Sequence, residues 1–109
     1  MGLNHYGSYY VHRTFEQGKD WGSDSQIWTT PYNKTNHLIG PFAESDWLNV
    51  VPEGFRRLIS WIDKRYNHTK IYVFENGVSV PHENDLPLKD ALHDSFRVHY
   101  YKQYINALE

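Results

Sequence analysis

Glu75 is the residue of this 109-residue chain whose type and position most clearly suggest chemistry. It follows the apolar run 71–74, and Asn76 and Gly77 come directly after it. In a closed barrel of parallel strands, the active site forms where the strands give way to loops at their carboxyl ends. A carboxylate at such a position can act as a nucleophile, a base or a metal ligand, and the alternative is a surface acid at a strand end.

The elements that must position Glu75 begin with two predicted strands. The run 71–74 reads Ile-Tyr-Val-Phe, a composition typical of a strand that is buried on both faces. The tyrosine-rich block 2–11 predicts a second strand close to the chain terminus.

Two further segments predict helices, over 52–66 and over about 90–108. The apolar residues of the first follow the i, i+3, i+4, i+7 spacing: Phe55, Leu58, Ile59 and Ile62. Those of the second recur every four residues: Phe96, Tyr100, Tyr104 and Leu108. Pro52 suits the start of the first helix, and Asn67 is a suitable stop.

The remaining segments predict loops. Gly, Asp, Ser, Asn, Thr and Pro dominate between Glu16 and Pro41, where we expect a long loop that is functional or mobile. A second loop passes through Pro81 and Pro87. The resulting alternation of strands and helices favours an α/β fold with a parallel sheet. Two strands are too few for such a sheet, so residues 1–109 are expected to form an incomplete domain whose strand edges need partners.

Composition argues against several classes of function. The net charge of −2, with acidic and basic residues interspersed, provides no basic surface for nucleic acid. No apolar stretch approaches the roughly 18 residues of a membrane span. The seven histidines show no zinc-binding spacing, cysteine is absent, and there is no glycine-rich phosphate loop. We therefore expect no metal, no cofactor, no nucleic acid and no membrane as partners.

Localisation is left open between secreted and cytoplasmic. Residues 1–10 lack the basic and apolar regions of a signal peptide. Asn33 and Asn67 begin Asn-x-Thr triplets that fit the N-glycosylation acceptor pattern, which is too short to establish a secreted parent.

The sequence around Glu75 resembles the nucleophile motif of glycoside hydrolase family 1. Residues 71–77 read I-Y-V-F-E-N-G and are similar to the family's I-Y-[IV]-T-E-N-G, with Phe74 where the family most often has Thr. Three other segments resemble the end of the sixth barrel strand, the approach to the sixth helix and the seventh helix: 2–6, 45–56 and 92–105. The similarity is thinnest over about 17–37. It implies a partial (β/α)8 TIM barrel of about two βα units.

The resemblance implies roles for four residues of a retaining β-glucosidase, which hydrolyses O-glycosyl bonds of β-glucosides in carbohydrate metabolism. Glu75 matches the nucleophile, Asn4 and Tyr6 match a pair near the sugar subsite, and Trp47 is similar to a tryptophan on the aglycone side. The tyrosine of that pair typically hydrogen-bonds the nucleophile, and such a donor favours the ionised carboxylate. The alternatives are that Tyr6 is a core aromatic and that Trp47 packs its loop against a helix.

The second carboxylate of such an enzyme is missing from the chain. A retaining glycosidase needs two carboxyl groups roughly 5 Å apart. In the family that the chain resembles, the acid/base lies in an Asn-Glu-Pro motif, and none of the six glutamates here does: Glu16, Glu44, Glu53, Glu75, Glu83 and Glu109. We expect activity to require the rest of the barrel. The alternative is a truncated or degenerate, non-catalytic fragment with at most weak sugar or partner binding. The preferred sugar, and a thioglucosidase or 6-phospho-glycosidase activity, stay open.

Overall fold

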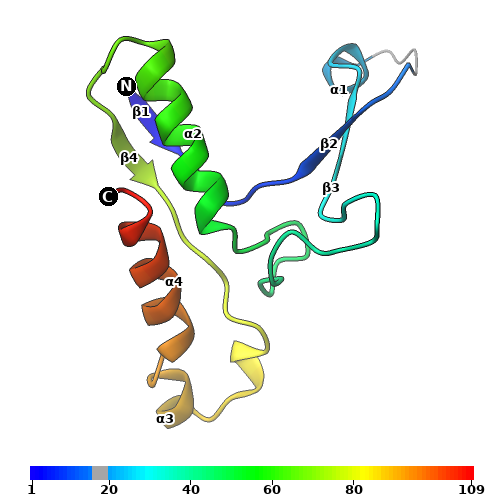
Figure 1. The fold of residues 1–109 in the computed structure, drawn as a ribbon. Helices are drawn as coiled ribbons and strands as arrows, with labels where there is room; N and C mark the ends of the chain where they lie inside the picture. Colours follow the sequence, from blue (N-terminus) through cyan, green and yellow to red (C-terminus); the bar gives the residue numbers. More distant parts are fainter. Residues whose placement is uncertain (16–19) are drawn as a thin grey trace. The chain divides into compact units, whose positions relative to one another are not determined.

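A computed structural model of the chain describes residues 1–15 and 20–109 (Figure 1). Glu16 and the start of the predicted long loop therefore lie outside the described residues. The chain divides into two compact units, residues 1–8 with 40–109, and residues 9–39.

The first unit contains a pair of parallel strands and two long helices. The strands β1 (Gly2–Asn4) and β4 (Tyr72–Glu75) are hydrogen-bonded neighbours, and α2 (Pro52–Arg65) precedes β4 in the chain. After β4 come η1 (Glu83–Asp85), α3 (Leu88–Ala91) and α4 (Ser95–Asn106). The parallel pairing and the strand–helix alternation confirm the predicted α/β character of the chain.

The helix α2 agrees with its prediction. Pro52 occupies its first turn, where its missing N–H costs no helical hydrogen bond, and Phe55 and Ile62 are buried on one face. Beyond the helix, Asn67 adopts a left-handed conformation with φ of 53°, which asparagine tolerates better than most residues.

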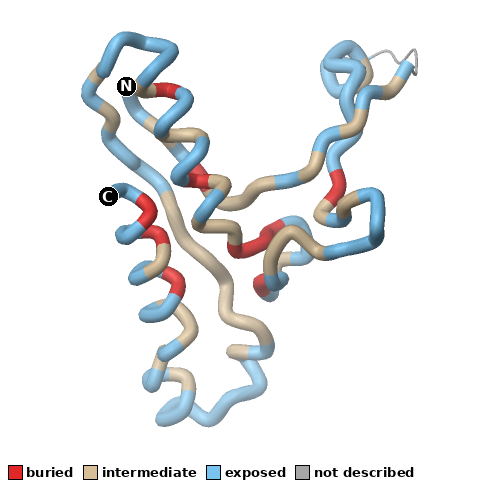
Figure 2. The backbone as a smooth tube through the Cα atoms, viewed as in Figure 1, coloured by how far each residue is buried: buried red, intermediate tan, exposed pale blue. Residues whose placement is uncertain are grey.

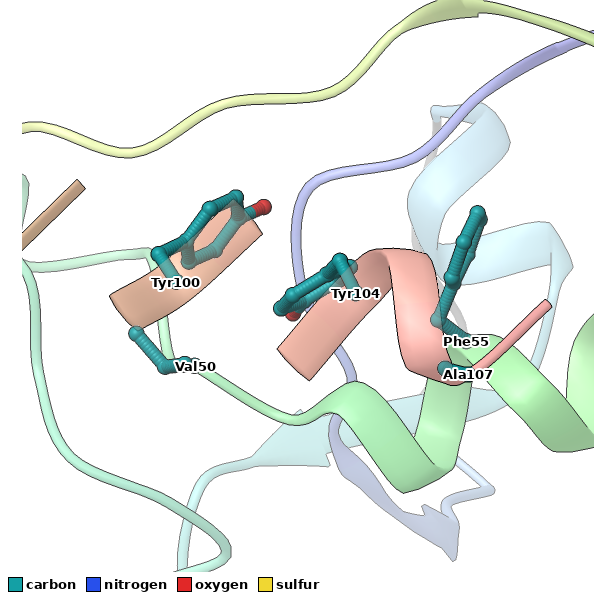
Figure 3. Close-up of a cluster of buried hydrophobic side chains, with 5 residues drawn as sticks. All are labelled: Val50, Phe55, Tyr100, Tyr104 and Ala107. Carbon is teal, nitrogen blue, oxygen red and sulfur yellow. The ribbon is translucent and has the colours of Figure 1, made fainter. Parts of the chain in front are cut away.

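The core of the first unit lies between α2, α4 and the strand β1. Five residues form it: Val50, Phe55, Tyr100, Tyr104 and Ala107 (Figure 3). The predicted four-residue repeat is wrong at its last member, because Leu108 is 54% exposed and Ala107 is buried instead. A helix has 3.6 residues per turn, so successive steps of four drift off the buried face and a step of three returns to it.

The prediction of one continuous helix over 90–108 is also wrong. The segment is divided into α3 and α4, and Asp94 caps α4 by accepting a hydrogen bond from the backbone N–H of Arg97. This cap starts a new helix within the predicted one, since an aspartate at an N-cap satisfies an N–H that has no helical partner.

The prediction that residues 71–74 are buried on both faces is wrong for this chain. In β4, Tyr72 is 59% exposed and Phe74 is 73% exposed, and Figure 2 shows the strand mainly in the colour of exposed residues. Among the described residues, β1 is the strand that pairs with β4. A barrel strand is buried by neighbours on both edges and by layers on both faces, and those partners are not supplied here.

The second unit is an antiparallel hairpin. Its strands β2 (Tyr10–Arg13) and β3 (Ile27–Thr30) pair in register, and α1 (Trp21–Asp24) lies between them in the chain with Asp20 as its N-cap. The predicted loop from 16 to 41 is therefore wrong over α1 and β3. The predicted strand over 2–11 is divided into β1 and β2. In both cases the position of a strand depends on pairing with residues distant in sequence, and local composition does not show that pairing.

Within the part of the chain that the structure describes, no helix combines the length and the apolar character needed to cross a membrane.

Candidate functional site

The strand register places Glu75 beside Asn4. Gly2 is paired with Tyr72 and Leu3 with Val73, but Asn4 is paired with Glu75, so the register shifts and Phe74 is passed over. In a regular strand, side chains alternate between faces and Glu75 would share a face with Val73. One extra residue reverses that relationship, as in a β-bulge. The shift therefore brings the Glu75 side chain to the face of Asn4.

The opposite face of β1 is directed at the helices. Leu3 packs against the core, and His5 is buried, with its ring centroid 4.8 Å from that of Phe55 and 6.2 Å from that of Tyr104. Since neighbouring residues of an extended chain point to opposite sides, Asn4 and Tyr6 point away from this core. The alternation of the chain thus separates the packing residues from the candidate site residues.

A hydrogen bond joins Tyr6 to Glu75. The Tyr6 hydroxyl donates to Oε2 of the carboxylate, across 69 positions of sequence. This hydrogen bond is the main cause that raises the pKa of Tyr6 above its usual value, so the hydroxyl stays protonated and remains a donor. The backbone supports the contact, because the N–H of His5 donates to the carbonyl of Glu75 at 3.0 Å.

Trp47 lies next to Tyr6. The two ring centroids are 6.0 Å apart and the rings meet edge to face at 77°. Trp47 is 54% exposed, so much of its indole is available to a ligand. Tyr6 is half-buried and is not a member of the core cluster, which argues against the core-aromatic alternative.

The structure thus brings together all four predicted site residues. Glu75 contacts Tyr6, Tyr6 contacts Trp47, and Asn4 is the register partner of Glu75. An ionised carboxylate with a phenol donor can attack an electrophilic carbon or accept a proton, and the neighbouring aromatic ring suits the apolar face of a sugar.

Sequence reasoning missed a layer of residues beneath the site. The side-chain amide of Asn76 donates to the carbonyl of His5 and to the hydroxyl of Tyr100, both at 2.9 Å. The hydroxyl of Tyr101 donates to the carbonyl of Asn76 at 3.3 Å. An amide placed directly after a carboxylate at a strand end was the available signal, but the partners of that amide lie in distant segments.

Sequence reasoning also missed the ion pairs of the loop that follows β4. Arg97 pairs with both carboxylate oxygens of Glu83 at 2.7 Å, with Asp94 at 2.6 Å, and with the carbonyl of Val78 at 3.3 Å. The hydrogen bonds from Arg97 lower the pKa of the Glu83 and Asp94 carboxyls. Arg97 therefore ties this loop to the first turn of α4.

Over residues 1–15 and 20–109, no group of three or more histidine, aspartate or glutamate side chains could hold a metal ion.

Comparison with known proteins gives a consistent result. The family model described as Glycosyl hydrolase family 1 matches residues 1–109. A crystal structure of the β-glucosidase from Trichoderma harzianum is similar at 46% identity with a TM-score of 0.89, covering 98% of this chain and 23% of that one. A β-glucosidase from Humicola insolens, solved in complex with glucose, is 42% identical with a TM-score of 0.86, covering 98% of this chain and 22% of that one.

A relative known from sequence agrees with the structures. Beta-glucosidase 40 of Arabidopsis thaliana is 35% identical over 114 residues, covering 100% of this chain and 22% of that protein. The chain thus spans about a fifth of the length of the curated relatives that it matches. Its mixed α/β structure corresponds to about 23% of a TIM-barrel enzyme. With the whole of residues 1–109 matched by the family model, the chain belongs to glycosyl hydrolase family 1.

Proposed function

We propose that the chain is the segment of a retaining β-glucosidase that supplies the catalytic nucleophile, Glu75. In this proposal residues 1–109 run from about the sixth strand to the seventh helix of a (β/α)8 barrel. The observation that carries the proposal is the hydrogen bond from Tyr6 to Glu75 at the carboxyl end of β4. Active sites of such barrels form at that end of the strands.

The reaction assigns a step to each group. A carboxylate oxygen of Glu75 attacks the anomeric carbon, and the glycosidic C–O bond breaks with its electron pair moving to the leaving oxygen. A second carboxyl group, from another part of the barrel, gives that oxygen a proton. The same group then takes a proton from water, whose oxygen attacks the anomeric carbon and releases Glu75. The Tyr6 hydroxyl donates a hydrogen bond to Oε2 of Glu75 and so orients the carboxylate for the first step.

Asn4 and Trp47 are assigned to binding. The amide of Asn4, beside Glu75 in the register, offers donors and an acceptor for a sugar hydroxyl. The half-exposed Trp47, in contact with Tyr6, is assigned to the aglycone side, where an apolar ring face covers the leaving group. The substrate class is a β-glucoside, in keeping with relatives named β-glucosidases and one solved with glucose.

The isolated 109-residue chain is expected to be inactive. None of its glutamates lies in an Asn-Glu-Pro motif, and loss of the acid/base alone costs about 10²- to 10⁴-fold in rate. Purified residues 1–109 should therefore give no turnover of an aryl β-glucoside. Hydrolysis that is abolished by Glu75→Gln would contradict this expectation.

The test of the nucleophile uses a complete barrel. We define the grafted barrel as the T. harzianum β-glucosidase in which residues 1–109 of this chain replace the matching segment. A 2-deoxy-2-fluoro-glucoside inactivator is expected to label the grafted barrel on the peptide that contains Glu75, as read by mass spectrometry. The Glu75→Gln variant should not be labelled.

Glu53→Gln provides the matched control, because Glu53 is an exposed acid of α2 whose ion pair within the described part of the chain is with Arg57, four residues along the same helix. This variant should be labelled as fully as the parent. Labelling of Glu75→Gln, or a folded grafted barrel that is not labelled at all, would reject Glu75 as the nucleophile and favour a degenerate, non-catalytic segment.

A further inference from the structure

We propose that Asn76 and Tyr100 form a positioning latch, which holds the Glu75–Tyr6 pair in place from beneath. The latch is defined as the Asn76 side chain with its two acceptors, the His5 carbonyl and the Tyr100 hydroxyl. This inference rests on the proposed role of Glu75. Both residues act through the backbone of their neighbours, so they are positioning residues.

The latch joins the ends of β1 and β4. Asn76 directly follows Glu75, and its Nδ2 is 2.9 Å from the carbonyl oxygen of His5, which directly precedes Tyr6. In return, the backbone N–H of His5 donates to the carbonyl of Glu75 at 3.0 Å. These two hydrogen bonds link the residue before Tyr6 with the residues at and after Glu75. A shift of either strand end would therefore stretch them.

Tyr100 gives the latch a rigid support on α4. The second Asn76 bond, to the Tyr100 hydroxyl at 2.9 Å, reaches a side chain that is only 2% exposed. Its ring stacks on that of Tyr104, with centroids 4.2 Å apart and planes at 24°. Both residues belong to the buried cluster drawn in Figure 3. Because Tyr100 is enclosed in the core, its hydroxyl holds Asn76 in one orientation.

The stacked pair of tyrosines extends the support to the start of α2. The ring of Tyr100 stacks on that of Tyr104, whose hydroxyl accepts a hydrogen bond from the backbone N–H of Val51 at 3.0 Å. Burial is the main cause that raises the pKa of both tyrosines, so both hydroxyls remain neutral. The support of Asn76 therefore reaches α4 through Tyr100 and the start of α2 through Tyr104.

The consequence for catalysis follows from the geometry that a nucleophile requires. A displacement of about 1 Å in a reacting group can cost about 100-fold in rate. Glu75 is the last residue of the short strand β4. Beyond it, where the loop begins, the backbone is held mainly by the two hydrogen bonds of the Asn76 side chain. Loss of the latch should lower the rate of the chemical step more than it weakens substrate binding.

The test compares Tyr100→Phe with Tyr66→Phe in the grafted barrel. The first substitution removes the hydroxyl that accepts from Asn76 and keeps the stacked ring; the second removes a hydroxyl from an exposed tyrosine at the end of α2. With active sites counted by the fluoro-glucoside, Tyr100→Phe should lower kcat about tenfold and change KM less than about threefold. Tyr66→Phe should leave both constants within about twofold of the parent. Equal constants in the Tyr100→Phe variant and the parent would overturn the latch while leaving the proposed nucleophile intact.

Crystal structures of the grafted barrel and its Tyr100→Phe variant supply a second measurement that does not depend on activity. We expect residues 75–77 to move and the Tyr6–Glu75 hydrogen bond to lengthen in the variant. An unchanged Tyr6–Glu75 geometry in a variant that has lost the Asn76–Tyr100 bond would also reject the latch. If the grafted barrel folds but fails to be labelled, the proposed function fails, and this structural comparison still decides whether the latch sets the geometry.

Discussion

Asn4 of β1 is the register partner of Glu75 of β4, although the preceding pair joins Leu3 to Val73 and leaves Phe74 between them. This single shift decides which face of the strand pair carries the carboxylate. Phe74, which stands where the family motif most often has Thr, is the residue that this shift passes over in the register.

Replacement of Tyr6 by Phe should lower kcat/KM of the grafted barrel by about 10- to 100-fold, the range expected for loss of a hydrogen bond to a charged group. The aromatic ring and its contact with Trp47 are retained, so the effect is that of the hydroxyl. Steady-state kinetics with an aryl β-glucoside measure it. Tyr9→Phe, an exposed position outside the first unit, is the control and should keep the parent value. An unchanged kcat/KM in Tyr6→Phe would show that the hydroxyl does not assist Glu75.

Replacement of Arg97 by Gln should loosen the loop between β4 and α4. Arg97 bridges Glu83, Asp94 and the carbonyl of Val78, and Gln cannot form the bidentate pair with a carboxylate. Limited proteolysis of the grafted barrel should cut residues 77–94 faster in the variant. Arg57→Gln removes an exposed pair with Glu53 on one helix, which is worth little, and should not change the cleavage rate.

The same ion pairs predict a dependence on pH. Arg97 lowers the pKa of the Glu83 and Asp94 carboxyls in the folded state. Their contribution to stability is therefore complete above the ordinary carboxyl pKa of about 4 and is lost as the pH falls through the lowered values. The free energy of unfolding of the parent, measured with urea, should fall over this acidic range by more than that of Arg97→Gln. Parallel curves for the two proteins would contradict the prediction.

Replacement of Gly54 by Ala should destabilise the protein, although alanine favours a helix by about 1 kcal/mol over glycine. A Cβ atom at Gly54 would lie 2.8 Å from the Cβ of Ser8 and still closer to its hydroxyl. The close approach of α2 to residue 8 therefore requires glycine. The melting temperature of the grafted barrel should fall in Gly54→Ala.

The double variant Gly54→Ala with Ser8→Gly distinguishes this clash from a general effect of substitution. Removal of the Ser8 side chain makes room for the new methyl group, so the double variant should melt above Gly54→Ala. Additive losses from the two single substitutions would show that the two residues do not interact.

Replacement of His5 by Phe should reduce the sensitivity of the protein to mild acid. Burial is the main cause that lowers the pKa of His5, and its Nδ1 has no hydrogen-bond partner in the described chain. Because His5 binds a proton less readily in the folded state than in the unfolded state, its full contribution to the free energy of unfolding is present above about pH 6.5. That contribution is lost as the pH falls through the lowered pKa. Between pH 7.5 and 5.5, the urea midpoint should fall less in His5→Phe than in the parent. His99→Phe, at an exposed position of α4, should behave like the parent.

Local patterns were sufficient for several elements and insufficient for others. The helix α2 was predicted almost to its bounds because its spacing, its proline and its stop are all local. The strand β3 was missed, because Ile27–Thr30 becomes a strand by pairing with β2 across the hairpin. The burial of β4 was predicted wrongly. Its apolar composition indicates a strand that is covered on both faces, but the described residues of this chain leave it exposed.

The sequence by itself determined the family motif around Glu75, the position of that residue at the end of a strand, and the alternation of strands and helices. These features depend on residue types and on short-range periodicity, which can be read along the chain. The resemblance already implied that Tyr6 hydrogen-bonds Glu75, whereas only the tertiary structure decided that Asn4 is the register partner of Glu75 and that Asn76 is held by Tyr100. The physical reason is that a strand register and a hydrogen bond between side chains join segments far apart in sequence, and no local preference records them.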